Sequence, residues 1–162
     1  MSEIRFPVLV EKHVLNIQGG AGHGRHRGGF GVVQEYRLLA DEAAFTTAIN
    51  RTRVPPWGVG GGQNGTTNIM IIIREGKEIL RTGKIMNFKL KKGDIVSIRS
   101  GGGAGWGDPL ERDPHLVSSD VRNGFITVNE ALDIYKVVLD AHTAEVDQSA
   151  TDELRKGLQQ TI

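Results

Sequence analysis

The chain has 162 residues, a length that favours one domain with a sizeable hydrophobic core. Its 20 basic and 19 acidic residues give a net charge of +1, which excludes the electrostatic attraction expected of a nucleic-acid-binding or membrane-binding protein. The chain has no cysteine, so disulfide bonds and thiolate metal sites are excluded, and its longest apolar run, residues 69–73, is too short to span a bilayer. Because the N-terminus has no signal-peptide pattern, a cytoplasmic location is expected.

Glycine is the exception in an otherwise ordinary composition, since 22 of the 162 residues are glycine, roughly twice the average usage of about 7%. The glycines gather in three clusters at residues 19–31, 58–65 and 101–107, with Val- and Ile-rich stretches between them. Such clusters at element boundaries favour formed loops in a strand-rich fold over disorder.

The first hundred residues predict a series of short strands. Apolar residues alternate there at the period of a half-buried strand in residues 5–16, 32–39, 86–90 and 95–99. Pro7 lacks an N–H group, which places it at a strand start or a sheet edge. Residues 69–73 are apolar on both faces and predict a central strand, and residues 74–77 predict a hairpin turn after it. Residues 43–49 fit either a strand or a helix.

After residue 110 the apolar period becomes helical. Asp113-Pro114 predicts a helix start and Asn123-Gly124 its end, and the run from Thr127 to Glu130 predicts a capping box. The apolar face of the capped helix is Val128, Ala131, Leu132, Tyr135, Val138 and Leu139. Residues 147–160 predict a last helix with a narrow apolar stripe of Ala150, Leu154 and Leu158.

These elements predict an α+β fold, in which an N-terminal, mostly antiparallel β-rich region with glycine-rich loops is followed by C-terminal helices. We expect a single domain over residues 1–162, β-rich over about residues 1–100 and helical over residues 111–162.

Residues 100–114 lie between the two halves and combine five glycines with two prolines, a tryptophan and four charges. This composition predicts a shaped loop and not a flexible linker. The pattern G-x-G-x-x-G occurs at residues 60–65, but it follows Pro-Pro-Trp-Gly and precedes a strand, whereas a dinucleotide site needs it between a strand and a helix. The sequence has no P-loop motif and no G-x-S-x-G motif.

Candidate functional side chains lie in the glycine-rich loops. His23, Arg25 and Arg27 belong to a basic loop that could contact an anion or a carboxylate, but without a nearby carboxylate motif a metal site is not expected. Asp108 is expected to start a turn, and Arg112 is expected to pair with one of the neighbouring carboxylates of residues 108–113 and fix the loop.

The two tryptophans each sit between glycines or prolines. Exposed, they would anchor a ligand or a partner, but burial beneath glycine backbones is the expectation. The residues that we single out as facing an active site or an interface are His23, Arg25, Arg27, Arg51, Trp57, Trp106, Asp108 and Arg112. No catalytic residue and no metal ligand is assigned.

Several motifs, taken together and in order, resemble the C-terminal part of the hydantoinase B/oxoprolinase family. They are Phe6-Pro7-Val8, Gly19-Gly20-Ala21-Gly22, RGGFGVV at residues 27–33, PPWGVGG at residues 55–61, Lys92-Gly93-Asp94, GWGDPLERDP at residues 105–114 and DVRNG at residues 120–124. The resemblance covers nearly residues 5–140, and the ordered set is specific although no single motif is. Family members are several-fold longer, and this chain departs from their usual pattern at Gln18 and at residues 100–105.

The resemblance implies an assembly in which a hydantoinase B-like large subunit works with an ATP-binding hydantoinase A-like partner. Such complexes open cyclic amides such as hydantoins and 5-oxoproline, and related ones carboxylate acetone or acetophenone. Their shared chemistry is phosphorylation of a carbonyl or enolate oxygen. The resemblance therefore implies that ATP, Mg²⁺ and, in some complexes, another divalent metal bind to partner subunits, and that this chain binds no cofactor itself.

The sequence thus predicts a small, non-catalytic subunit of such a complex, which completes the fold of the B-like subunit and contributes to assembly and to shaping the active site. The alternative is a stand-alone module that binds a small anion or amide through residues 23–27 and Trp106. A self-sufficient amidohydrolase is a weaker third hypothesis.

Overall fold

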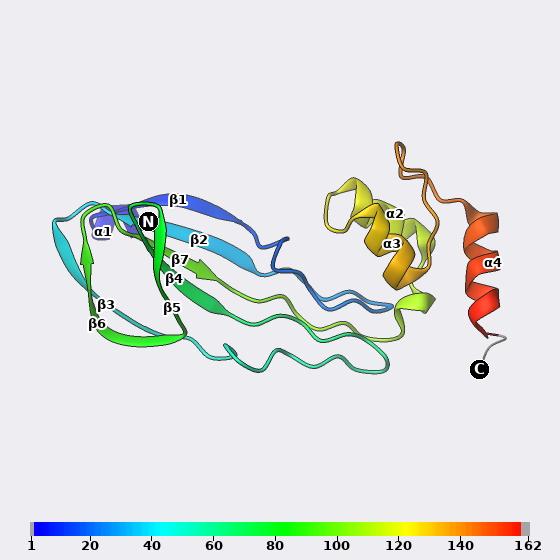
Figure 1. Cartoon of the computed structure of the whole chain (residues 1–162), viewed down its shortest axis with the longest axis horizontal. Helices are drawn as coiled ribbons and strands as arrows, with labels where there is room; N and C mark the ends of the chain where they lie inside the picture. The colour runs from blue at the N-terminus through cyan, green and yellow to red at the C-terminus, as the bar shows by residue number, and fades with distance from the viewer. Residues whose placement is uncertain (1, 160–162) are drawn as a thin grey trace.

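The computed structural model describes residues 2–159 and has a long shape, with a β-sheet region at one end and helices at the other (Figure 1). Long extended segments without regular secondary structure connect the two ends. The elements are α1 (Ser2–Arg5), β1 (Val8–Leu15), β2 (Val32–Leu38), β3 (Glu42–Ala48), β4 (Ile69–Arg74), β5 (Lys77–Thr82), β6 (Lys84–Lys91), β7 (Ile95–Arg99), the 3₁₀ turn η1 (Pro109–Glu111), α2 (Pro114–Arg122), α3 (Val128–Tyr135) and α4 (Gln148–Gln159).

The strands form a five-stranded antiparallel sheet of order β1-β2-β7-β4-β5 and a separate two-stranded sheet of β3 and β6. The predicted α+β class and antiparallel strands are confirmed, and the open segment, residues 43–49, falls largely in strand β3. β4 lies inside the sheet, as its apolar run predicted, and Pro7 directly precedes the edge strand β1. Glu75 and Gly76 both have positive φ angles, 50° and 76°, which suit the tight turn predicted between β4 and β5.

One hydrophobic core lies between the two sheets. Its buried members are Leu38, Met70, Ile72, Leu90 and Val96. Phe45 of β3 and Phe88 of β6 pack against this cluster, so the two-stranded sheet covers one face of the larger one. Burial of this apolar surface is the main stabilising contribution at this end of the molecule.

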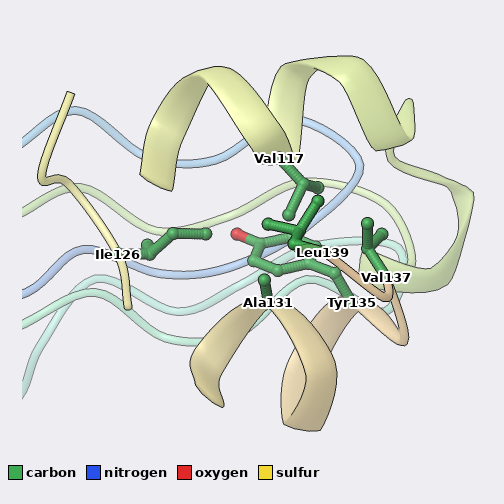
Figure 2. Packing of buried hydrophobic residues seen from close by; sticks show 6 residues of the cluster. All are labelled: Val117, Ile126, Ala131, Tyr135, Val137 and Leu139. Carbon is green, nitrogen blue, oxygen red and sulfur yellow. The ribbon is translucent and has the colours of Figure 1, made fainter. Parts of the chain in front are cut away.

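The second core belongs to the helices, and Figure 2 shows its residues converging between α2 and α3. Its buried members are Val117, Ile126, Ala131, Tyr135, Val137 and Leu139. Both predicted helix starts are confirmed, because Asp113 accepts a hydrogen bond from the His115 N–H at 2.8 Å and Thr127 forms a reciprocal capping box with Glu130.

The predicted extent of the capped helix is wrong at its C-terminal end. α3 stops at Tyr135, and Lys136 takes a left-handed conformation with φ 52°. The Val137 N–H then donates to the Ala131 carbonyl at 3.0 Å, and the Val138 N–H donates to the hydroxyl of Thr151 on α4 at 3.0 Å instead of to a helical carbonyl. Leu139 is still buried, but as part of the segment that returns to α4.

α4 follows the prediction for residues 147–160 as far as the structure describes it. Ala150 and Leu154 of the predicted stripe are half-buried, whereas the side chain of Leu158 lies outside the described residues, as does Gln160. Across residues 2–159, none of the helices has the length and apolar content that crossing a membrane requires.

Candidate functional site

The glycine-rich loops form one structure, which we call the glycine bundle: residues 18–31, 58–67 and 100–107. Its segments run side by side between the sheet and the helices (Figure 1) and are joined by backbone hydrogen bonds. The Gln63 N–H donates to the His23 carbonyl at 2.7 Å, and the Gly105 N–H donates to the Gln63 carbonyl at 2.9 Å. The Gly22 N–H donates to the Gly103 carbonyl at 2.8 Å, which joins the first segment to the third. Backbone polar groups are therefore paired across segments without a regular β-ladder.

The close approach of these backbones explains the high glycine content. A Cβ at Gly105 would lie 2.5 Å from the carbonyl carbon of His23 and would overlap its oxygen. A Cβ at Gly31 would meet the Ser100 carbonyl in the same way, at 2.6 Å from its carbon. Only glycine fits where backbones pack this closely. The clusters are thus formed loops, as predicted, and the bundle carries the candidate residues His23, Arg25, Arg27 and Trp106.

A buried ionic cluster joins the glycine bundle to the helices. Asp120 of α2 accepts hydrogen bonds from Arg27 at 3.2 and 3.3 Å and from Arg112 at 2.9 Å. Arg112 also donates to the Arg25 carbonyl at 3.1 Å, and Arg155 of α4 donates to the Arg112 carbonyl at 3.0 Å. Arg112 and Asp120 are only 8% and 6% exposed. This cluster ties helices α2 and α4 to the loop at residues 100–114.

The expected partner of Arg112 is corrected by this geometry. Its neighbours in sequence, Asp108, Glu111 and Asp113, make other contacts, and the ion pair is made with Asp120 instead. Asp108 caps the 3₁₀ turn by accepting from the Leu110 N–H at 2.9 Å. Glu111 forms an exposed pair with Arg25 at 3.6 Å. Arg112 does fix the loop, as predicted, but through the helix that follows.

His23 lies beside this cluster and pairs with a residue that the sequence did not single out. Its Nδ1 lies 2.8 Å from the hydroxyl oxygen of Tyr135 on α3, and the two rings meet edge to face. Burial lowers the pKa of His23 below its ordinary value, which favours the neutral imidazole. Burial also raises the pKa of Tyr135 to about 12, so the phenol stays protonated. The predicted basic loop is thus partly buried and not fully solvated.

A pocket of about 380 Å³ opens beside His23. His23, Arg27, Phe30, Phe125 and Glu130 are among its lining residues. The Arg27 guanidinium lies 4.5 Å from the ring centre of Phe30 and is already paired with Asp120. Glu130 is occupied in the capping box. The pocket therefore offers one imidazole and aromatic walls, with its charged groups already engaged in the fold.

The two tryptophans contradict the expectation of burial, since Trp57 is 69% exposed and Trp106 is 52% exposed. The backbone of Trp106 is held by hydrogen bonds of 2.9 Å in both directions with His26, and its ring packs against that imidazole at 5.5 Å. The backbones of the glycine segments lie in direct contact, which leaves no room for an indole beneath them. Both rings therefore project outward, as an anchor for a partner or ligand would.

The remaining candidates fall at a different place. Arg51 and Trp57 line a cavity of about 880 Å³ at the end of the sheet, which also contains residues 81–84. The structure thus brings together His23, Arg25, Arg27 and Arg112 at the helical junction, and separates them from this second group. Among residues 2–159, no set of three or more His, Asp or Glu side chains is arranged to hold a metal ion.

Comparison with known proteins assigns the fold to a family. The family model described as hydantoinase B/oxoprolinase matches residues 1–109 of this chain. The chain belongs to this family. The family resemblance of the sequence motifs is thereby confirmed, and the match includes the sheet and the whole glycine bundle.

Relatives of this hydantoinase B/oxoprolinase chain are much longer than the chain itself. An uncharacterized protein of Methanocaldococcus jannaschii is 34% identical over 155 residues, which are 94% of this chain and 27% of the relative. The acetophenone carboxylase delta subunit of Aromatoleum aromaticum is 30% identical over 184 residues, covering 94% of this chain and 27% of that subunit. The crystal structure of the ATP-dependent caprolactamase from Pseudomonas jessenii superposes with a TM-score of 0.75 at 27% identity, over 95% of this chain and 27% of that one. The chain thus spans about a quarter of the length of each of these three proteins.

Proposed function

We propose that this chain acts as a small subunit of an ATP-dependent complex, of the hydantoinase/oxoprolinase type or of the ketone carboxylase type. In this role it completes the fold of a hydantoinase B-like subunit and contributes to assembly and to the shape of the active site. The observation that carries the proposal is the likeness to an ATP-dependent enzyme: the fold superposes on the caprolactamase from Pseudomonas jessenii with a TM-score of 0.75, over 95% of this chain and 27% of that one. In that caprolactamase, a unit of this fold is therefore part of a much longer chain.

The use of the charged side chains supports this role. Asp120 holds Arg27 and Arg112, Asp108 caps a turn, and Glu130 caps a helix. General acid–base or nucleophilic catalysis needs a side chain held within reach of the reacting group and free to exchange a proton. Most of the candidate groups are instead engaged in holding the fold together. We infer that ATP, Mg²⁺ and any further divalent metal of the complex bind to hydantoinase A-like and B-like partner subunits.

The exposed Trp106 supports docking through the glycine bundle. Tryptophan is enriched among the residues that dominate binding energy at protein interfaces. Val59, whose backbone pairs with Trp106, is also half exposed, so the two form a small apolar surface on the bundle. A partner that covers this surface would lie against the segments that connect sheet and helices.

Co-purification tests the proposal. We expect the tagged chain to retain the hydantoinase A-like and B-like large chains through size-exclusion chromatography, and ATP-dependent turnover to require all three. Turnover is assayed with hydantoin, 5-oxoproline and caprolactam, and separately with acetone or acetophenone plus bicarbonate. Trp106→Ala should weaken association at least tenfold, whereas Leu116→Ala, which changes a residue of equal 52% exposure on α2, should not.

A different set of results would contradict this role. If the chain elutes as a stable monomer in the presence of the large chains, and their activity is the same without it, the subunit role is wrong. A rise in melting temperature of the isolated chain with hydantoin, 5-oxoproline or a ketone would instead favour the stand-alone binding module.

A further inference from the structure

The cavity at the end of the sheet carries an unbalanced charge. It lies between the segment that follows β3, residues 49–57, and the turn that joins β5 to β6, residues 81–84. Its cationic lining residues are Arg51, Arg53, Arg81 and Lys84. The lining thus has 4 of the chain's 20 basic residues and none of its 19 acidic ones. On a chain with a net charge of +1, this is a local concentration of positive charge.

Within the described part of the chain, most of these cations have no counter-charge. Arg81 pairs with Glu78 at 2.7 Å on strand β5. Over the described residues, the side chains of Arg51, Arg53 and Lys84 are exposed and make neither an ion pair nor a side-chain hydrogen bond. Each is therefore available to an anionic group that enters the cavity.

The segment that presents two of these cations is held in place. The Asn68 side chain donates to the Asn50 carbonyl at 2.8 Å, and the Asn68 N–H donates to the Arg51 carbonyl at 3.0 Å. Arg51 is fixed with a φ of 54°, a conformation that is uncommon for residues other than glycine, Asn and Asp. On the other wall, the Ile49 N–H donates to the Gly83 carbonyl at 2.8 Å, which fastens the segment to the β5–β6 turn.

The cavity also presents apolar side chains. Val54 and Trp57 line it, and each is 69% exposed. Ile49 and Ile69 line its inner part and are half-buried. Exposed Trp and Arg together are typical of a protein interface, where aromatic and guanidinium groups are enriched. The volume of about 880 Å³ is larger than a phosphate group or a small carboxylate needs, and it suits a peptide segment.

We propose that this cavity docks an acidic segment of the hydantoinase B-like large subunit, one that contains Asp or Glu residues around at least one apolar side chain. The acidic groups pair with Arg51, Arg53 and Lys84, and the apolar side chain packs against Trp57. The inference rests on the proposed subunit role and adds the chemistry of one contact between the chains. Charge complementarity of this kind raises the association rate and makes it depend on salt.

Charge reversal at the cavity tests the contact. The double variant Arg53→Glu/Lys84→Glu is compared with Arg5→Glu/Lys89→Glu, which makes the same change in net charge at exposed positions outside the cavity. Binding to the immobilised large subunit is measured at about 50 and 500 mM NaCl. The cavity variant should bind at least tenfold more weakly at low salt and lose most of its salt dependence, while the control should bind within about twofold of wild type. Equal binding by wild type and both variants would overturn the inference while leaving the subunit role intact.

A second arm uses the isolated chain, so it does not depend on the subunit role. A synthetic Asp/Glu-rich peptide with one central leucine is titrated into a Trp106→Phe background, in which Trp57 is the remaining tryptophan. The Trp57 emission should shift with the acidic peptide, and not with a matched peptide in which Lys replaces the acidic residues. A response to ATP or inorganic phosphate with none to the acidic peptide would overturn the inference and assign the cavity to a small anion. Failure of wild type to bind the large subunit, with a normal peptide response, would overturn the subunit role alone.

Discussion

Substitution of Gly105 by alanine tests the packing of the glycine bundle. The new methyl group would meet the His23 carbonyl, with its carbon 2.5 Å away, whereas real Cβ contacts are essentially never shorter than 3.0 Å. The two segments must therefore separate by about 1 Å, a distance that backbone hydrogen bonds cannot absorb. Across these two segments the Gly22 N–H donates to the Gly103 carbonyl at 2.8 Å and the Trp106 N–H donates to the His26 carbonyl at 2.9 Å, so both bonds are weakened. At about 1 kcal/mol per bond, plus about 1 kcal/mol for overpacking, we expect the free energy of unfolding to fall by about 3 kcal/mol.

Gly29→Ala is the matched control, because no atom lies within 4 Å of a Cβ added there and the residue has no positive φ angle. Its free energy of unfolding should stay the same or rise by up to about 1 kcal/mol, since alanine reduces the freedom of the unfolded chain. Both variants are unfolded in urea and followed by far-UV circular dichroism and tryptophan fluorescence, whose transitions should coincide if unfolding is two-state. A loss of less than about 1 kcal/mol for Gly105→Ala would refute the reasoning, since the bundle would then open without breaking its bonds.

Three further predictions concern side chains. Asp120→Ala leaves Arg27 and Arg112 buried without their counter-charge, so the free energy of unfolding in urea should fall by about 3–5 kcal/mol. Glu78→Ala, which breaks an exposed ion pair, should lower it by less than about 1 kcal/mol, and equal losses for the two variants would contradict the reasoning. The pKa of His23 in the folded protein lies below the ordinary 6.5, so the unfolded chain binds the proton first as pH falls, and stability is lost from about pH 6.5 downward. The melting temperatures at pH 7.5 and pH 5.5 should therefore differ less for His23→Asn than for wild type. Thr127→Ala removes the cap of α3 and should reduce the free energy of unfolding by about 1 kcal/mol, a loss that Thr127→Ser should largely restore.

Features set by neighbouring residues were predictable from the sequence. The β4–β5 turn at Glu75-Gly76, the cap at Asp113 and the capping box at Thr127 each depend on groups within three residues of one another, and all are present. The antiparallel strands followed from alternation of apolar residues. The end of α3 was missed because the group that accepts from the Val138 N–H, the hydroxyl of Thr151, lies 13 residues further along the chain.

The site was less predictable because its contacts join distant parts of the chain. His23 meets Tyr135 across 112 positions, and Arg27 meets Asp120 across 93. Tyr135 was assigned to an apolar face, which is correct for its ring, but periodicity says nothing about the partner of its hydroxyl. Asp120 carries a signal in retrospect, since an acidic residue three positions after the buried Val117 lies on the buried face of α2 and needs a cation there. The exposure of Trp106 could not be inferred, because it follows from backbone-to-backbone packing that no apolar pattern encodes.

The glycine bundle has a consequence for how this protein can change over evolution. Surface loops usually accept inserted or deleted residues, because few contacts depend on their length. Here Gln63 is bonded to His23 on one side and to Gly105 on the other, so three distant stretches of sequence share one register. One residue inserted into any of these segments would change the register of every following carbonyl and glycine relative to the other two segments. Among homologues, these three loops should therefore keep their lengths together, while the short turns of the sheet vary in length.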